Sequence, residues 1–428
     1  MSDAEAPAIP DRLPPTAYVL AVVLGIVGAT GATVFLWLMH ELQHGFIEGL
    51  PQALGWETAP AWWIVGGLLI SVGIILIAQR MPGHTGKGPL TGFHFDNPPK
   101  VAPSILLAAL ATLTFGAALG PEGPLIVVGT TLGGLLMRKA PANVATLAMF
   151  LTGIAAIGAI FGNPFITAFL LLEFAAMGAA PKVILLPAFV ALGSGYITQV
   201  GWGSWTGLGT MSLSVPGLPS YDHINPGDLI AGIAVAIVAA LLTAIAREMG
   251  ERVQARSERS PALMLIIAAL VTAGVAIAVV EIFDVNYDQI LFSGQSGMPG
   301  IIAETSVAAV IAIVIGKLIV YGLALGAGFR GGPIFPATFI GVGFGVLAAL
   351  LFTDLSVSAM AAVGIASAAT VMTRLPFTSG LIAMLLIGSA GAAIAPFAII
   401  GAIGGFAAAK MLDAYDAKRT GIPATPIG

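Results

Sequence analysis

The stretch GPEGPLIVVGTTLGG, residues 120–134, decides the fold, because a related stretch, GGPIFPATFIGVGFG, follows at residues 331–345. Matching Pro124 to Pro336 sets an offset of 212 residues between the two. The same offset places Gly129 on Gly341, Gly133 on Gly345, and the dipeptide Pro164-Phe165 on Pro376-Phe377. The chain therefore contains an internal repeat, and each copy holds an apolar segment interrupted by proline and glycine.

The composition is that of a chain whose solvent is lipid. Only 9% of its 428 residues are charged, 57% are hydrophobic, and the mean hydropathy is +0.99. Soluble domains carry about 25% charged residues, so a water-soluble protein is excluded. Cysteine is absent, which also excludes a disulfide framework and a thiolate metal site. We therefore predict an all-α membrane protein.

Apolar runs follow one another with few polar breaks. A straight helix needs about 20 residues to span a bilayer, and several runs are shorter or contain glycine and proline. We therefore expect many broken and tilted helices. The runs lie near 17–40, 60–79, 103–119, 124–138, 144–161, 164–178, 184–200, 229–246, 262–280, 305–327, 335–352, 357–372, 377–394 and 397–411.

The positions of Lys and Arg predict which helix ends face the cytoplasm. The stretch 247–261 carries four arginines and the C-terminal tail carries Lys418 and Arg419, whereas 201–228 has neither residue type. Basic loops are enriched on the cytoplasmic side, so we predict a multi-pass protein of the cell (inner or plasma) membrane with both termini cytoplasmic. The predicted divisions are a cytoplasmic tail at 1–16, a first membrane repeat at 17–200, an extracellular connection at 201–228, a second repeat at 229–412 and a cytoplasmic tail at 413–428.

Glu122 is the strongest candidate for a functional residue. It lies between proline and glycine, with apolar runs before and after it. A helix that starts at such a break exposes unpaired backbone N–H groups, which form a ready anion site. A carboxylate can occupy that site and leave it when protonated. Ionisable residues inside a membrane are generally functional, although an acidic end to an interfacial loop is the alternative.

Four segments resemble, in order, the CLC family of chloride channels and proton-coupled chloride transporters. GPEGP resembles the family's GREGP/GKEGP motif, and TGIAAIGAIFGNPFITAFLLLE, residues 152–173, resembles the segment that follows it. GGPIFP at 331–336 resembles its GxFxP motif, and RLPFTSG at 374–380 resembles its R-x-P-x-T segment. The resemblance implies a bundle of two inverted halves, which forms a homodimer with a separate pore in each subunit.

The resemblance also implies an activity and a set of residues. The protein would transport chloride or a similar small anion, with protons as a possible second substrate, the lipid bilayer as its surroundings and Glu122 as the gate. It would need no cofactor or metal, bind no nucleic acid and have no enzymatic activity. The residues implied at the anion path are Gly86, Lys87, Gly88, Gly123, Ile334 and Phe335, with Tyr415 as the candidate for the family's coordinating tyrosine.

Departures from the family pattern affect both substrates. The family loop GSGIP is replaced by GKGPL at 86–90, which puts Lys87 where a serine coordinates the anion. Lys87 is either a fixed cation beside the path or a lysine that extends to the interface. Many exchangers carry a second, internal glutamate after the one that matches Glu173, and here that residue is Phe174. We therefore expect a channel or weakly coupled transporter, with Glu173 as a candidate proton site, and keep an obligate chloride/proton antiporter as the alternative.

A pattern at 40–44 predicts a different class of protein. His40-Glu41-Leu42-Gln43-His44 fits H-E-x-x-H, which places two histidines one helical turn apart with a glutamate for base catalysis. An intramembrane zinc metalloprotease is the function this pattern predicts. It requires a third ligand, and the remaining histidines, His84, His94 and His223, lie in no recognisable partner motif. We keep the protease as the alternative of another class.

Overall fold

The structure is a computed structural model that describes residues 13–178, 181–206 and 215–420. All regular secondary structure in these ranges is helical, apart from one isolated β-bridge, and the ranges contain no strand. Within them, nine helices are long and apolar enough to cross a membrane, and five more are apolar but shorter. The predicted all-α membrane fold is confirmed.

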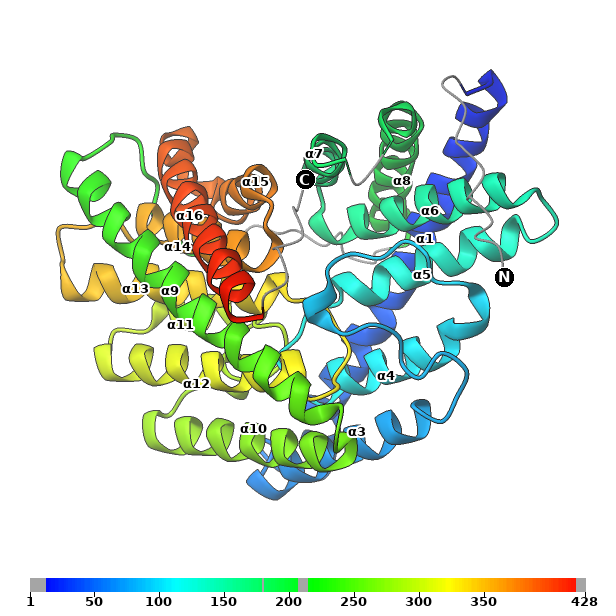
Figure 1. Cartoon of the computed structure of the whole chain (residues 1–428). Helices are drawn as coiled ribbons and strands as arrows, with labels where there is room; N and C mark the ends of the chain where they lie inside the picture. The colour runs from blue at the N-terminus through cyan, green and yellow to red at the C-terminus, as the bar shows by residue number, and fades with distance from the viewer. Residues whose placement is uncertain (1–12, 179–180, 207–214, 421–428) are drawn as a thin grey trace.

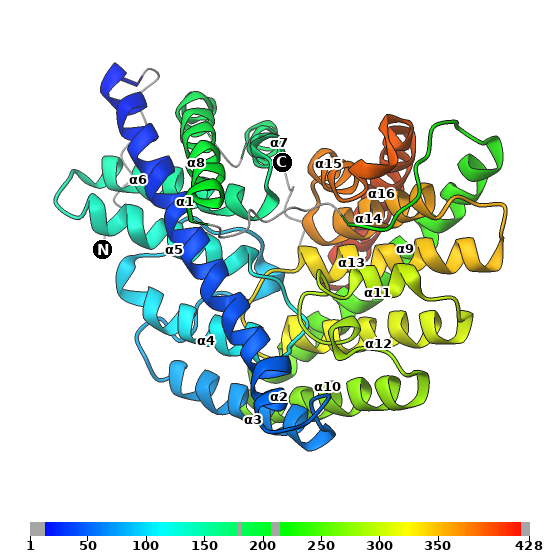
Figure 2. The same ribbon diagram turned by 180° about the vertical axis from the view of Figure 1, so that it is seen from behind.

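The helices form two halves that lie side by side, coloured blue to green and green to red in Figure 1. The first half contains α1 (Pro15–His44), α2 (Leu50–Ala53), α3 (Ala61–Ala78), α4 (Ala102–Thr114), α5 (Glu122–Leu136), α6 (Ala142–Phe161), α7 (Pro164–Ala176) and α8 (Leu185–Thr206). The second contains α9 (Pro226–Ser257), α10 (Pro261–Phe283), α11 (Met298–Ala303), α12 (Val307–Gly326), α13 (Ile334–Leu351), α14 (Val357–Thr373), α15 (Pro376–Leu386) and α16 (Ala395–Thr420). Figure 2 shows α1 crossing the first half diagonally, where it contacts α4, α5, α6 and α8.

The internal repeat is confirmed at the level of single residues. Helices α5 and α13 begin 212 residues apart, α7 and α15 begin 212 apart, and α6 and α14 end 212 apart. The equivalent residues Gly120 and Gly332 pair with each other in antiparallel fashion, with N–O distances of 2.8 and 2.5 Å. Equivalent residues meet in this way at a two-fold axis, so the axis that relates the two halves passes between these glycines.

The repeat also preserves backbone conformation where the side chains differ. The residue that follows α6, Gly162, has a φ of 59°, and the equivalent residue after α14, Arg374, has a φ of 65°. This left-handed region favours glycine. The guanidinium of Arg374 forms an ion pair with Asp413 of α16 at 2.6 Å, and it also donates to the carbonyl of Val371. These contacts hold a non-glycine residue at a position that the repeat assigns to glycine.

Two helices extend well beyond the apolar runs that predicted them. The run at 229–246 becomes a helix that ends at Ser257, and the run at 397–411 becomes one that ends at Thr420. In α9 the extension carries ion pairs one turn apart, Arg247 with Glu251 at 3.1 Å and Arg252 with Glu248 at 2.7 Å. Such pairs stabilise a helix outside lipid, where hydropathy gives no signal. The polar stretch predicted at 247–261 is therefore mostly helix.

Glycines set the distance between the central helices. A Cβ atom built on Gly129 of α5 would lie 2.5 Å from the carbonyl oxygen of Thr152 in α6. In the second half, a Cβ on Gly341 of α13 would lie 2.5 Å from the carbonyl of Gly364 in α14. The backbones approach too closely for any side chain, which is the packing that small residues permit in membranes.

We predict that Gly341→Ala destabilises the protein, because the added methyl group forces α13 and α14 apart. Overpacking of this kind costs about 1–3 kcal/mol. Thermal denaturation of the purified protein in detergent, followed by size-exclusion chromatography, measures the effect. The control is Gly274→Ala in α10, where the added Cβ meets no atom within 4 Å. Equal melting temperatures for Gly341→Ala and the wild type would contradict the close approach.

Candidate functional site

The candidate site lies at the axis between the halves and is built around Glu122. Glu122 is the first residue of α5, and its side chain is fully buried. One carboxylate oxygen, Oε1, accepts a hydrogen bond at 2.9 Å from the backbone N–H of Phe335, at the start of α13. The N-terminus of a helix carries unpaired N–H groups and a partial positive charge. An acidic side chain of the first half therefore occupies the anion-binding end of a helix of the second half.

Two glycines leave the space that the carboxylate fills. Cβ atoms built on Gly120 and Gly332 would lie 2.1 and 1.9 Å from Oε2 of Glu122. These are the same two residues whose backbones pair across the axis. The atom Oε2 is buried and has no hydrogen-bond partner among the described residues. The pocket for the carboxylate thus depends on glycine at both equivalent positions and satisfies only one of the two oxygens.

Aromatic side chains pack around the start of α13. Tyr321 of α12 is fully buried, and its hydroxyl donates to the carbonyl of Pro333 at 2.7 Å. The ring of Phe335 lies against Phe161, with 6.3 Å between centroids. Sequence reasoning missed Tyr321, because one tyrosine inside a long apolar helix gives no signal until the helix is placed.

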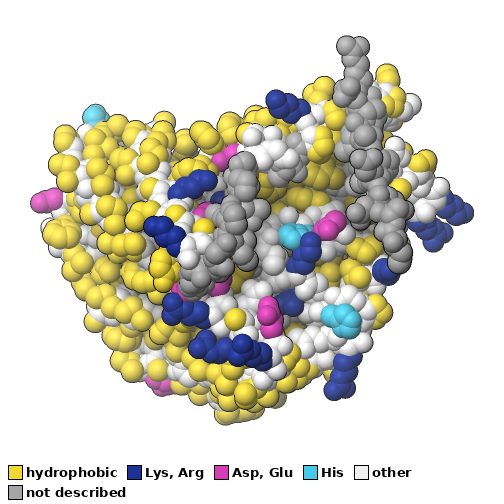
Figure 3. Space-filling model, viewed as in Figure 1, with side chains coloured by type: hydrophobic (Ala, Val, Ile, Leu, Met, Phe, Trp, Pro, Cys, Tyr) yellow, Lys and Arg dark blue, Asp and Glu magenta, His cyan; other side chains and the backbone are white. Residues whose placement is uncertain are grey.

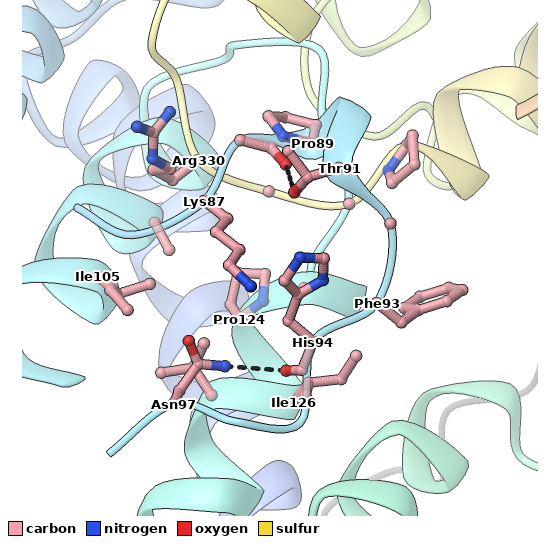
Figure 4. A pocket seen from close by; sticks show the side chains of 18 of the residues that line it. Lys87, Pro89, Thr91, Phe93, His94, Asn97, Ile105, Pro124, Ile126 and Arg330 are labelled. Carbon is pink, nitrogen blue, oxygen red and sulfur yellow. Dashed lines mark hydrogen bonds between the residues drawn. The ribbon is translucent and has the colours of Figure 1, made fainter. Parts of the chain in front are cut away.

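A cavity lies beside Gly123 and Gly332, the neighbours of Glu122, and its lining comes from both halves (Figure 4). Its volume is about 100 Å³, which is room for several water molecules. Gly332, which lies against Oε2 of Glu122, is part of the cavity wall. The lining comprises Lys87, Gly88, Pro89, Thr91, Gly92, Phe93, His94 and Asn97, then Ile105 and Ala109 of α4, Gly123, Pro124, Ile126 and Val127 of α5, Arg330–Pro333, and Met372 and Thr373 of α14.

Most residues predicted at the anion path come together here. Lys87, Gly88 and Gly123 line the cavity, and the start of α13, Ile334 and Phe335, holds Glu122. Gly86 lies directly before the lining, and its carbonyl accepts a hydrogen bond from the lining residue Arg330 at 3.3 Å. Tyr415 is the exception. It lies on α16, 57% exposed, and is not part of the cavity wall.

Lys87 combines features of both interpretations. Its side chain extends toward the middle of the cavity in Figure 4. It is also 54% exposed, and its ammonium lies 3.5 Å from a carboxylate oxygen of Asp96. Ion pairs this exposed contribute little to stability. Lys87 therefore contributes a positive charge to the cavity that is hydrated and partly neutralised by Asp96.

Arg330 is a second cation at the cavity, and sequence reasoning missed it. Its Nε donates to the carbonyl of Thr85 at 2.7 Å, and its Nη1 donates to the carbonyls of Gly328 and Phe329 at 3.1 Å each. These bonds hold the loop before Lys87, in which four consecutive residues, Gly83 to Gly86, have positive φ. A signal was present in the sequence, because Arg330 is the one charged residue between Lys317 and Asp354.

Glu173 occupies a second helix start across the junction of the halves. Its Oε1 accepts from the N–H of Phe377, and its Oε2 accepts from the N–H of Thr378, both at 2.8 Å. The hydroxyl of Thr378 donates to the same carboxylate. Phe174 packs instead against Phe93 of the cavity lining, with 6.0 Å between ring centroids. Glu173 is therefore fully engaged as the N-terminal cap of α15.

The H-E-x-x-H pattern lies at the end of α1, apart from this site. The rings of His40 and His44 stack with centroids 6.4 Å apart, and His44 lies 3.4 Å from a carboxylate oxygen of Glu48. Both histidines line a separate cavity of about 380 Å³. In the described part of the chain, no three His, Asp or Glu side chains are grouped to hold a metal ion. The third ligand that the protease interpretation requires is not among these residues.

Comparison with known proteins agrees with this geometry. Residues 84–410 match the family model described as voltage gated chloride channel. The chain is 27% identical over 343 residues to YfeO of Escherichia coli O139:H28 (strain E24377A / ETEC), a protein named for ion transport, covering 76% of this chain and 77% of YfeO. The crystal structure of a slow cyanobacterial Cl⁻/H⁺ antiporter is similar with a TM-score of 0.77 at 18% identity, over 97% of this chain and 96% of the antiporter. A CLC-type fluoride/proton antiporter is similar with a TM-score of 0.71 at 20% identity, over 92% and 95%. The chain belongs to the voltage gated chloride channel family, the CLC family whose motifs its own resemble.

Proposed function

We propose that this protein carries chloride or a similar small anion across the cell membrane along a path that Glu122 gates. The observation that supports this most directly is the position of the Glu122 carboxylate. It is buried at the N-terminus of α13, where an anion would bind, and its neighbours Gly123 and Gly332 line a cavity whose wall also includes Lys87 and Arg330. A carboxylate and a chloride ion compete for such a place, because both are anions that need the same N–H donors.

The gate follows from this competition. When ionised, Glu122 is held by the amide of Phe335 and by the positive end of α13. When protonated, it loses that attraction and leaves the amide free for an anion. Backbone groups at Gly86–Gly88, Gly123, Ile334 and Phe335 would line the path, and Lys87 and Arg330 would raise the local anion concentration. Tyr415 stays a prediction without support from its exposed position on α16.

We propose a channel-like or weakly coupled transport mode. Phe174 cannot bind a proton, and the carboxylate of Glu173 is committed to three hydrogen bonds at the start of α15. Both features weaken a proton route through α7. The obligate antiporter is the second candidate, because two structures with this fold are described as proton antiporters.

We further propose that both termini face the cytoplasm and that the protein forms a homodimer in the bilayer, with one pore in each subunit. Dark-blue basic side chains lie across the middle of the face shown in Figure 3 and at its right edge, whereas its left rim is mainly hydrophobic. The basic end of α9, with Arg252 and Arg256, fits the cytoplasmic side. The dimer follows from the family resemblance.

Glu122→Gln tests the gate. The amide mimics the protonated carboxyl, so we expect a higher anion flux at neutral pH and little change in flux as the pH falls. Chloride efflux from proteoliposomes, measured with a chloride electrode between pH ~5 and ~8, provides the comparison. Glu281→Gln, at an exposed site near the end of α10, is the matched control and should behave as the wild type. A wild-type rate with a wild-type pH response in Glu122→Gln would remove this residue from the gate.

Gly332→Ala tests the pocket that holds the gate. A methyl group 1.9 Å from Oε2 cannot coexist with the carboxylate, so the side chain of Glu122 must leave the start of α13. We expect the pH dependence of chloride efflux to weaken, as in Glu122→Gln. Gly73→Ala in α3, where a Cβ meets no atom within 4 Å, controls for the added methyl group. Retention of the full wild-type pH response would show that the carboxylate does not act from this pocket.

Proton coupling is tested by imposing a chloride gradient on sealed proteoliposomes while an ionophore clamps the membrane potential at zero. We expect little or no uphill proton movement, because the proton route through α7 is weak. Chloride and proton electrodes read both fluxes together. Uphill proton movement with a fixed stoichiometry would instead establish the obligate antiporter.

A further inference from the structure

We propose that Arg330 is a positioning residue for the permeating anion. Its guanidinium holds the loop of residues 83–88 in a strained conformation, and this conformation sets the affinity and selectivity of the cavity for anions. The inference rests on the proposed anion path, in which the backbone of Gly86–Gly88 takes part. It assigns to Arg330 a role that its charge alone does not supply, because the guanidinium acts on the anion through the backbone of the first half.

The loop needs support from outside, because its backbone conformation is unfavourable by itself. Four consecutive residues, Gly83 to Gly86, have positive φ, and two of them carry side chains, His84 with a φ of 46° and Thr85 with a φ of 67°. The left-handed region is costly for a residue with a Cβ atom, and it persists only where the surroundings hold it. Inside the loop, Gly86 donates to the carbonyl of Gly83 at 2.8 Å, and the hydroxyl of Thr85 donates to the carbonyl of His84 at 2.6 Å. Neither contact uses the carbonyls of Thr85 and Gly86.

Arg330 supplies the support from the second half of the chain. Its Nε donates to the carbonyl of Thr85 at 2.7 Å, and its Nη2 donates to the carbonyl of Gly86 at 3.3 Å. The guanidinium is itself fixed, because Nη1 donates to the two carbonyls that precede it, at 328 and 329. The backbone N–H of Arg330 also donates at 3.0 Å to the hydroxyl of Thr112 in α4. A guanidinium has five N–H donors in a rigid fork, and here backbone carbonyls occupy most of them.

The loop leads directly into the wall of the cavity. Lys87 and Gly88 follow the positive-φ residues and line the cavity together with Arg330 (Figure 4). The pair of Lys87 with Asp96 is exposed and holds the ammonium weakly. The bonds from Arg330 therefore decide where the backbone of Gly86–Gly88 lies. Any displacement of this segment moves both the backbone N–H groups and the lysine that would face an anion.

Arg330→Lys separates position from charge, because lysine keeps the positive charge but lacks the planar fork. In proteoliposomes, we expect the half-saturating chloride concentration for efflux to rise about tenfold and the ratio of chloride to nitrate flux to change about threefold, since hydrogen bonds from a charged group are lost. The maximal rate should change by less than about twofold.

Arg138→Lys, at an exposed site just after α5, is the matched control and should leave affinity, selectivity and rate unchanged. Wild-type affinity and selectivity in Arg330→Lys overturn the inference. Absence of chloride flux from the wild-type protein refutes the proposed function itself, so the two failures are distinguishable.

A second substitution tests whether strain in the loop is what Arg330 opposes. His84 is exposed, so His84→Gly removes little packing, and glycine adopts positive φ without strain. We expect His84→Gly to restore part of the chloride affinity and selectivity that Arg330→Lys loses, and to change the otherwise wild-type protein little. A double variant whose affinity and selectivity are no better than those of Arg330→Lys contradicts the role of strain.

A measurement on the wild-type protein serves if Arg330→Lys does not fold. Hydrogen–deuterium exchange of the amides at 83–88 reports whether the loop is held. We expect slow exchange, although His84 and Lys87 have exposed side chains, and a further slowing when chloride replaces gluconate. Rapid exchange, or exchange that chloride does not change, overturns the inference.

Discussion

The structure depends on the hydrogen bond between the carboxylate of Glu122 and the first turn of α13. Helices that start inside a membrane leave N–H groups without partners, and lipid offers none. The first half satisfies this need for the second half with an acidic side chain, and Glu173 does the same for α15. Neither helix start needs a polar cap from its own half. The contact that stabilises the fold is thus the contact that a permeating anion would replace.

This arrangement explains why glycine is concentrated at the centre. Gly120 and Gly332 allow the backbones to pair across the axis and leave space for the carboxylate beside them. Gly129 and Gly341 bring the next helices into contact, so that α5 and α13 are held from behind. A rigid pair of helices then fixes where their N-termini meet. The placement of the two helix starts is a result of backbone packing rather than of many side-chain contacts.

The sequence predicted the features that repeat and missed those that arise between distant segments. The offset of 212 located the starts of α5 and α13, because proline and glycine occur where the backbone needs a particular conformation. Hydropathy placed the apolar cores of the helices but not the ends of α9 and α16, which charged pairs stabilise outside lipid. Arg330 holds a loop some 245 positions away in the chain, and pairing at that separation leaves no local pattern.

Because the first half supplies both carboxylates to the second half, the order of synthesis affects assembly. Glu122 and Glu173 are synthesised long before α13 and α15, since the whole of α8 to α12 lies between them and the first of their partners. A nascent chain that has inserted only α1–α8 holds two acidic groups in the bilayer with no N–H donors opposite them, a state that is costly in hydrocarbon. Closure of the site is therefore a late event of assembly. A ribosome that stalls after the first half would leave an intermediate that membrane quality control can recognise by its exposed carboxyl groups.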